Sequence, residues 1–138
     1  MQDDKFINSV ARLLSVSRDQ ATKITAAVLC ELRGRLTPKE TADAAAQMPQ
    51  ELKRMWMADD SPDRKVRRIH RSEFIREISE RAEIQEAEAA HAVKVVFRGL
   101  QEVFQSPTGQ EREAWDIYSQ LPMDLKKIWL DASRIQWK

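Results

Sequence analysis

Apolar residues recur at spacings of three and four along nearly the whole chain, which is the period of an α-helix. No segment alternates apolar and polar residues as a half-buried strand does, and only three glycines and five prolines interrupt 138 residues. The pattern therefore predicts an all-α fold. The predicted helices cover about 3–14, 18–35, 38–48, 49–58, 72–82, 85–104, 110–121 and 122–135.

Several predicted helices begin with a recognisable start signal. Ser17 with Gln20, and Thr37 with Glu40, have the capping-box spacing, in which two side chains satisfy free backbone N–H groups. A proline at the first helical position loses no hydrogen bond. The prolines predicted to occupy that position are Pro38, Pro49 and Pro122.

The two halves of the chain carry the same apolar pattern. At an offset of 68 residues the first predicted helix of each half aligns, and after an insertion near 106–109 the offset becomes 73. The aligned pairs include Phe6 with Phe74, Ile7 with Ile75, Val10 with Ile78, Pro49 with Pro122 and Trp56 with Trp129. We therefore expect one bundle-like domain, 1–138, of about eight helices in two tandem pseudo-repeats of a four-helix unit. The expected boundaries are about 3–58 and 72–135, joined by a basic linker at about 59–71.

The same residues resemble a known family. The runs Ala26 to Glu40 and Ala46 to Leu52, together with Glu73-Phe74-Ile75 and Gln120-Leu121-Pro122 with Trp129, are similar to the family catalogued as domain of unknown function 2267. This resemblance implies a small, helical, bacterial protein and brings no assigned activity. The chain departs from the family pattern at Met57 to Pro62, where members are aromatic and glycine-bearing, so no role of that linker is carried over.

Composition sets the expected compartment. The chain is 42% hydrophobic and 33% charged, and no run of 18 apolar residues exists, so we expect a soluble protein without a membrane span. The first residues lack the basic start and apolar middle of a secretory signal. A single cysteine, Cys30, forms no intrachain disulfide and fits a reducing compartment. These observations predict a cytoplasmic location.

The sequence contains few groups of residues that could catalyse a reaction or bind a metal ion. Glu88 and His91 have the Glu-x-x-His spacing of di-iron bundles, but a second inward-facing pair is not evident. On a helical wheel His91 falls with Val95 on the side opposite the apolar stripe, which predicts a solvent-facing histidine. Cys30 lies mid-helix near Arg33, on a flank predicted to be partly exposed. With no glycine-rich phosphate loop and no strand-borne serine, we expect neither an enzyme nor a cofactor.

One local feature suggests a binding role. Residues 64–71 hold five basic side chains in eight positions, although the net charge of the whole chain is only +1. Such a run attracts phosphate, yet Asp59, Asp60 and Asp63 precede it and a whole-domain basic surface is missing. A solvated or internally paired linker, an acidic protein partner and nucleic acid all remain open. The candidate contact residues are Arg64, Lys65, Arg67, Arg68 and Arg71.

The tryptophans divide into core and surface candidates. Trp56 and Trp129 close equivalent apolar stripes, so they are predicted to lie in the core. Trp115 and Tyr118 align with alanines, so they either fill the core or reach an interface. Trp137 has no counterpart in the other half and is predicted to be exposed, either as a self-association contact or in a frayed end.

These patterns favour a non-enzymatic protein-interaction or self-association module. The alternative is a weak nucleic-acid binder that uses the basic run from Arg64 to Arg71. The partner itself is not encoded in helical periodicity.

Overall fold

The chain folds into helices throughout the part that the computed structural model describes, which comprises residues 2–58, 65–66, 70–104, 117–119, 121 and 123–137. No strand occurs within these residues, and residues 117–119 are also helical, so the all-α prediction is confirmed. The helices with described bounds are α1 (Gln2–Leu14), α2 (Arg18–Arg33), α3 (Pro38–Ala45), α4 (Gln50–Met57), α5 (Arg71–Ala82), α6 (Glu86–Phe104) and α8 (Met123–Ala132).

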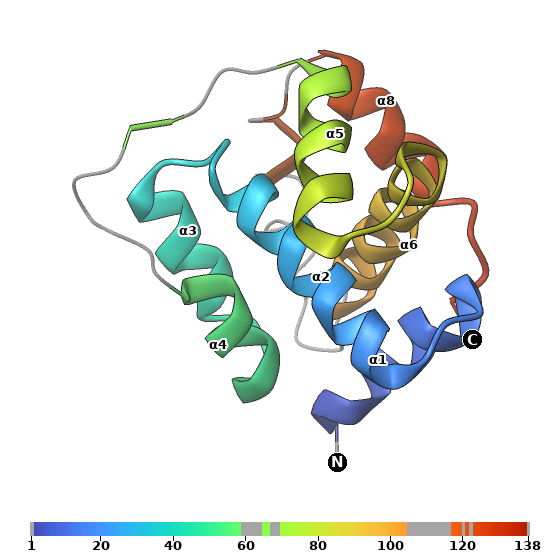
Figure 1. The fold of residues 1–138 in the computed structure, drawn as a ribbon. Helices are drawn as coiled ribbons and strands as arrows, with labels where there is room; N and C mark the ends of the chain where they lie inside the picture. The colour runs from blue at the N-terminus through green and yellow to red at the C-terminus, as the bar shows by residue number, and fades with distance from the viewer. Residues whose placement is uncertain are drawn as a thin grey trace.

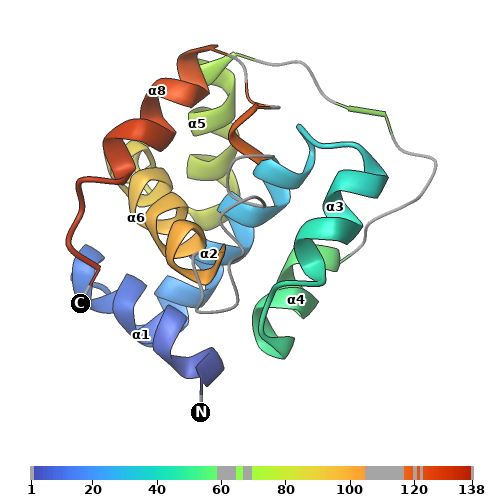
Figure 2. The ribbon, with the colours of Figure 1, turned by 180° about the vertical axis from the view of Figure 1, so that it is seen from behind.

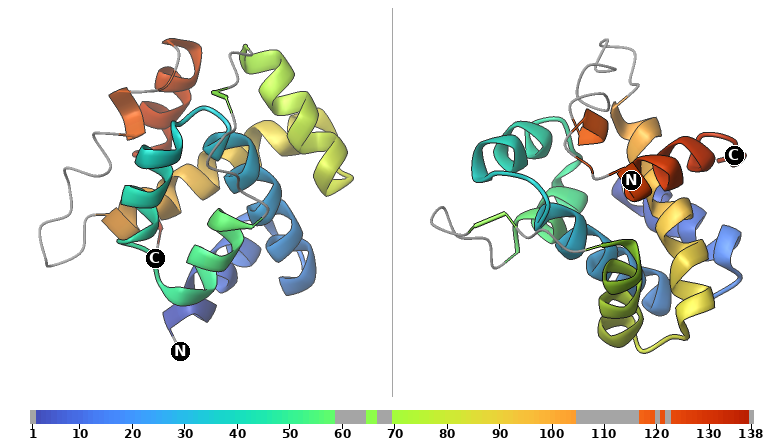
Figure 3. Two further views of the ribbon diagram at one scale, coloured as in Figure 1. Left: turned by 90° about the vertical axis from the view of Figure 1, so that its left-hand side faces the viewer. Right: turned by 90° about the horizontal axis from the view of Figure 1, so that it is seen from above.

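The two longest helices, α2 and α6, form the centre of the molecule. They contact each other, and around them α1 packs on both, α5 packs on both, α4 packs on α2, and α8 packs on α6. Figure 1 shows α2 between the α3–α4 pair and α5, and Figure 2 shows α6 from behind with α8 beside it. In the right-hand view of Figure 3 the α3–α4 pair lies to one side of α2, while α6 and α8 lie to the other.

A single cluster of buried apolar side chains joins all seven of these helices. Trp56 and Trp129 both belong to it, as their aligned positions predict. Phe97 lies between two other rings, with its centroid 5.1 Å from that of Trp129 and 6.4 Å from that of Phe74. Side chains of this size dominate core energetics because each buries a large apolar area.

Local sequence signals mark the starts of α2 and α3. Thr37 and Glu40 form a complete capping box, with Pro38 at the first position of α3, and the Ser17 hydroxyl accepts the Gln20 N–H at the start of α2. Pro49 was predicted at a first helical position, but it is the N-cap residue of α4. Pro122 lies outside the described residues.

The ends of three helices differ from the predicted bounds. The helix predicted at 18–35 ends at Arg33, the one predicted at 38–48 ends at Ala45, and the one predicted at 122–135 ends at Ala132. In each case the next residues tighten into turns with i to i−3 hydrogen bonds, such as Arg35 N–H to the Leu32 carbonyl and Met48 N–H to the Ala45 carbonyl. Tightened last turns satisfy carbonyls that an α-helix leaves free, and apolar periodicity does not distinguish them from helix.

Helices α1 and α5 end in the same left-handed cap. Ser15 and Glu83 each have a φ of 57°, and the following residues, Val16 and Ile84, donate to the carbonyls of Ala11 and Ser79. This six-to-one bond is the Schellman arrangement, which favours glycine at the left-handed position. The two non-glycine caps are 68 residues apart, which is the offset that aligns the halves of the sequence.

Other contacts follow the two alignments as well. The α1–α2 and α2–α4 contacts of the first half match the α5–α6 and α6–α8 contacts of the second. Arg33 donates to the Trp56 carbonyl, and its aligned residue Gln101 donates to the carbonyl of Trp129, each at 2.9 Å. These pairings support the duplication. The tandem repeat and its boundaries stay predictions, because most of 105–122 lies outside the described residues.

Helix α6 is buried more widely than the helical wheel predicts. His91 is exposed, as predicted, whereas Val95, which the wheel places on the same side of the helix, is only 1% exposed. Helix α6 is buried on more than one side because four other helices, α1, α2, α5 and α8, pack on it. None of the helices in the described part of the chain has the length and apolarity that crossing a bilayer requires.

Candidate binding groove

A groove open to solvent lies over α2, between α4 and α5. Its volume is about 700 Å³. Figure 1 shows the arrangement that creates it, with α4 and α5 on opposite sides of α2. The lining residues are Lys23, Ala26, Ala27, Cys30, Arg33, Arg54, Met55, Ala58 and Arg81. We call this surface the basic groove, because four of these nine side chains are cationic and none is acidic.

Two of the cations are positioned by glutamates just outside the lining. Lys23 on α2 pairs with Glu83, the residue that caps α5. Arg81 on α5 donates through Nε to Glu31 at 2.8 Å, and the Glu31 side chain is buried whereas that of Arg81 is half-exposed. Both ion pairs join α2, which forms the floor of the groove, to α5, which forms one of its walls. They therefore hold this wall at a set distance from the floor.

Arg33 positions the opposite wall. Its Nη1 atom donates to the carbonyl oxygens of Trp56 at 2.9 Å and Ala58 at 2.5 Å, which lie at the end of α4. The carbonyls at a helix C-terminus carry partial negative charge and favour a cation. Only 7% of Arg33 is exposed, so this arginine mainly anchors α4 and presents little of its surface to the groove.

The floor of the groove is apolar and contains the one cysteine. Ala26 and Ala27 on α2 supply apolar surface between the cations, and Met55 adds to it from the α4 wall. Cys30 is partly exposed, as predicted, and its Sγ lies 3.9 Å from Nη2 of Arg33. The groove therefore combines small apolar side chains with cations at its margins, which suits a ligand that has an apolar and an anionic side.

The lining of the groove is cationic. Four of its nine side chains are basic and none is acidic, and two of the four, Lys23 and Arg81, pair with the carboxylates of Glu83 and Glu31 outside the lining. The hydrogen bond from Lys23 and its charge hold the pKa of Glu83 below the ordinary value, so this carboxylate is ionised at neutral pH. A groove of one sign concentrates ligands of the opposite sign.

The predicted basic run contributes no described residue to this groove. Lys65, His70 and Arg71 are exposed, and the main-chain N–H of Arg71 donates to Oδ2 of Asp124 at 2.7 Å, which ties the start of α5 to α8. Arg64, Arg67 and Arg68 lie outside the described residues. The role of the run as a contact surface stays a prediction.

The other sequence candidates are distributed over the surface and the core. Glu88 accepts the Gln85 N–H at the start of α6 and is a helix cap, and the described residues contain no group of three metal-ligating side chains. Tyr118 is partly buried against the core with Lys126 Nζ 5.4 Å from its ring centroid. Trp115 lies outside the described residues. Trp137 was predicted to be exposed, which is wrong: its ring packs on Phe6.

The sequence contained only part of the signal for the groove. Lys23, Ala26, Cys30 and Arg33 follow one another at intervals of three or four, so they share one flank of α2. The residues that face them, Arg54 and Arg81, are distant in sequence. Their approach depends on tertiary packing, which periodicity does not report.

The fold and the groove define a small all-α protein with a cationic surface groove. Residues 3–110 match the family described as uncharacterized conserved protein (DUF2267). The chain belongs to this family, which confirms the resemblance of its helical motifs. No curated protein matches the chain.

Proposed function

We propose that this protein is a non-enzymatic protein-interaction module, and that the basic groove receives an acidic amphipathic helix of a partner protein. The observation that carries the proposal is the lining of the groove, with four cations and no carboxylate around an apolar floor. An amphipathic helix lying in such a groove places apolar side chains on the floor and carboxylates toward the margins.

The walls of the groove favour a peptide over chemistry on a small substrate. Helices α4 and α5 lie on opposite sides of α2 (Figure 1), and the groove that their residues line together with those of α2 is open to solvent. The cations at its margins are supported by specific partners, such as Glu31 for Arg81 and Glu83 for Lys23. Fixed charges of this kind contribute orientation and association rate more than affinity.

The test uses the full chain and two synthetic amphipathic peptides. One carries leucine on one helical face and glutamate on the other, and the second has lysine in place of glutamate. We expect isothermal titration calorimetry to detect binding of the acidic peptide only. Replacing Lys23→Glu and Arg54→Glu together is expected to weaken that binding by about tenfold, or about 1.4 kcal/mol.

A matched variant separates the groove from general charge. The Lys53→Glu, Lys127→Glu double variant changes the net charge by the same amount at two exposed positions outside the lining. It is expected to bind the acidic peptide as the unmodified chain does. Equal loss in both variants, or no binding of the acidic peptide at all, overturns the groove as a docking site.

Nucleic acid is the second candidate, because Lys65 and Arg71 of the basic run are exposed. A labelled mixed-sequence DNA duplex, followed by fluorescence anisotropy at two salt concentrations, separates the candidates. Binding that weakens steeply with salt and disappears in an Arg67→Glu, Arg68→Glu variant supports the nucleic-acid function. Binding of the acidic peptide that is unchanged in that variant supports the groove.

A further inference from the structure

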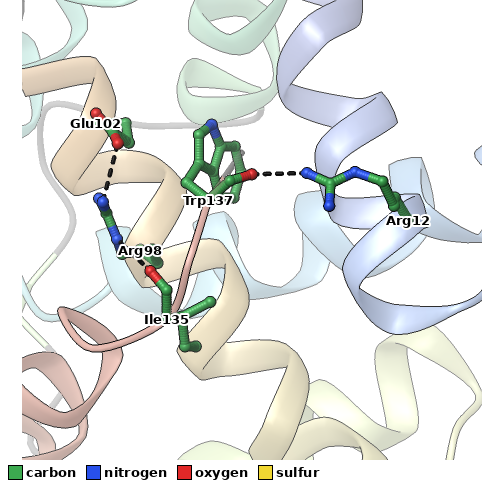
Figure 4. Close-up of polar contacts among 5 residues, drawn as sticks. All are labelled: Arg12, Arg98, Glu102, Ile135 and Trp137. Atoms are coloured by element: carbon green, nitrogen blue, oxygen red, sulfur yellow. Dashed lines mark hydrogen bonds and ion pairs between the residues drawn. The ribbon is translucent and has the colours of Figure 1, made fainter.

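The residues after α8 form a segment that crosses α6 and reaches α1. Residues 133–135 turn back on the end of α8, with N–H groups that donate to the carbonyls of residues 130–132. Beyond the turn, Nε of Arg98 donates to the Ile135 carbonyl at 2.8 Å, and Nη2 of Arg12 donates to the Trp137 carbonyl at 2.7 Å. Figure 4 shows the segment held between these two arginines.

The ring of Trp137 lies over Gly99, where no side chain occupies the space. It packs on Phe6 with ring centroids 5.4 Å apart and planes inclined by 55°. A Cβ atom added at Gly99 would lie 2.6 Å from Cη2 of Trp137 and 2.6 Å from Cε2 of Phe6, which is closer than van der Waals contact allows. Any residue other than glycine at this position therefore conflicts with the ring. We call Phe6, Arg12, Arg98 and Gly99 the α1–α6 socket.

The socket recognises features that are general to peptides. Both arginines donate to main-chain carbonyl oxygens, and Arg98 is oriented by Glu102, whose carboxylate accepts from its Nη2 at 2.9 Å. The one side chain of the segment that the socket selects is the aromatic ring of Trp137, which occupies the space over Gly99. Main-chain bonds combined with a pocket for one side chain are a common mode of peptide recognition.

We propose that the α1–α6 socket is a self-association site, in which the 133–137 segment of a second copy of this chain replaces the segment of the first. The second copy is the occupant because the structure shows the socket filled by this very segment, so the same contacts form between copies without new chemistry. Exchange of an identical element is a low-cost route to a dimer.

Two further observations support exchange. The connection that must open is the turn at 133–135, where Ser133 and Arg134 are exposed. The exposed large apolar side chains of the described chain are Met123, at 81%, and Leu130, at 55%, and both belong to α8. Leu130 lies three residues before the segment, so a copy that donates its segment also brings Leu130 to the surface of the other copy.

The proposal does not depend on the function of the basic groove, because no socket residue lines that groove. The experiment measures the mass of the full chain by light scattering from about 5 to about 500 μM, before and after refolding at high concentration. We expect a dimer whose fraction rises with concentration. Because the closed monomer makes the same contacts as the exchanged dimer, the Trp137→Ala and Arg12→Ala variants weaken the segment in both forms, and each is expected to leave the dimerisation constant nearly unchanged.

Complementation distinguishes exchange from a dimer formed elsewhere. The Arg12→Ala chain has an intact segment and the Trp137→Ala chain has the unaltered socket, so an equimolar mixture is expected to form a heterodimer more readily than either variant self-associates. A mixture whose heterodimer does not exceed the random proportion overturns the proposal, and so does a large loss of dimer in either variant alone, because that loss marks a dimer with contacts that the closed monomer lacks.

A direct binding measurement keeps the test decisive if no stable dimer accumulates. A fluorescein-labelled peptide of residues 133–138 is titrated with the full-length Trp137→Ala chain, whose folding is checked by circular dichroism. We expect saturable binding, at least about tenfold tighter than to the unmodified chain, in which the socket is filled internally. Absence of binding to the folded Trp137→Ala chain overturns the proposal.

Discussion

Arg33 donates through Nη1 to the main-chain carbonyl oxygen of Trp56 at 2.9 Å, and so joins the end of α2 to the end of α4. The indole Nε1 of the same tryptophan donates to the Thr41 carbonyl at 2.8 Å, which joins α4 to α3. Trp56 thus carries one bond toward α2 and one toward α3. Gln101 makes the corresponding bond to Trp129 in the second half, without a formal charge.

Loss of the Arg33 side chain is expected to destabilise the fold. The Arg33→Met substitution removes a charged donor from a buried carbonyl, so we expect the free energy of unfolding to fall by about 2–3 kcal/mol. Arg33→Gln, which mimics Gln101, is expected to lose less. Chemical denaturation measures both, with Lys53→Met on exposed α4 surface as the control, expected within about 0.5 kcal/mol of the unmodified chain. Equal losses for Met and Gln would contradict the role of the donated bond.

Glycine is expected to stabilise the left-handed cap of α1. Ser15 has a φ of 57°, which costs a residue with a Cβ about 1 kcal/mol or more. We expect Ser15→Gly to raise the free energy of unfolding by about 0.5–1 kcal/mol, the remainder being offset by the greater chain entropy of glycine. Glu83→Gly relieves the same strain but removes the Lys23 ion pair, so its gain is smaller. Thermal unfolding of the two variants side by side shows whether this order holds.

The Lys23–Glu83 pair is expected to depend on pH. The pKa of Glu83 lies below its ordinary value of 4.5, first because Lys23 hydrogen-bonds to it and second because of the charge of Lys23. A lowered folded-state pKa contributes stability that is complete above pH 4.5 and is lost as pH falls through the folded value. Lys23→Met should return the pKa toward the ordinary value.

The measurement is an NMR titration of the Glu83 side-chain carboxyl in both chains. Because both side chains are largely exposed, added salt is expected to reduce the difference between them. The stabilities of the two chains should converge in acid. An unchanged Glu83 titration in the Lys23→Met chain would exclude the pair as the cause.

Cys30 reports on the charge of the basic groove. It is partly exposed and shares the lining with Lys23 and Arg54, so a dianionic aromatic disulfide reagent should react with it faster than a neutral one of similar intrinsic reactivity. We expect the Lys23→Glu, Arg54→Glu variant to slow the anionic reagent by about tenfold and to leave the neutral one nearly unchanged. Absorbance of the released thiolate gives both rates. Parallel slowing of the two reagents would indicate altered access instead of altered charge.

The helices were predictable because their signals are local. The Thr37–Glu40 capping box and the Ser17 cap act within one turn, and apolar residues at three- and four-residue spacing specify the buried face. The central position of α6 was not predictable from the same pattern. Val95 falls on the polar side of the wheel and is nevertheless buried in the structure, where four other helices pack on α6.

The groove and the socket required the tertiary structure. Alignment of the halves pointed to Trp56 and Trp129 but gave Trp137 no counterpart, so its contact with Phe6 had no sequence signal. The space above Gly99 is defined by two rings that lie on other segments. Spacing along one helix identifies a flank, whereas a binding surface is formed by flanks that distant helices bring together.

The peripheral position of α3 and α4 has a consequence for the motions of the native state. Helix α3 has α4 as its main neighbour, and α4 rests chiefly on α2, whereas α2 and α6 are surrounded by other helices. Such a pair is suited to open as one cooperative unit while the rest of the fold remains closed. The amide hydrogens of α3 and α4 should then exchange with solvent earlier than those of α2 and α6. Because α4 is one wall of the basic groove, each opening also changes the width of that groove.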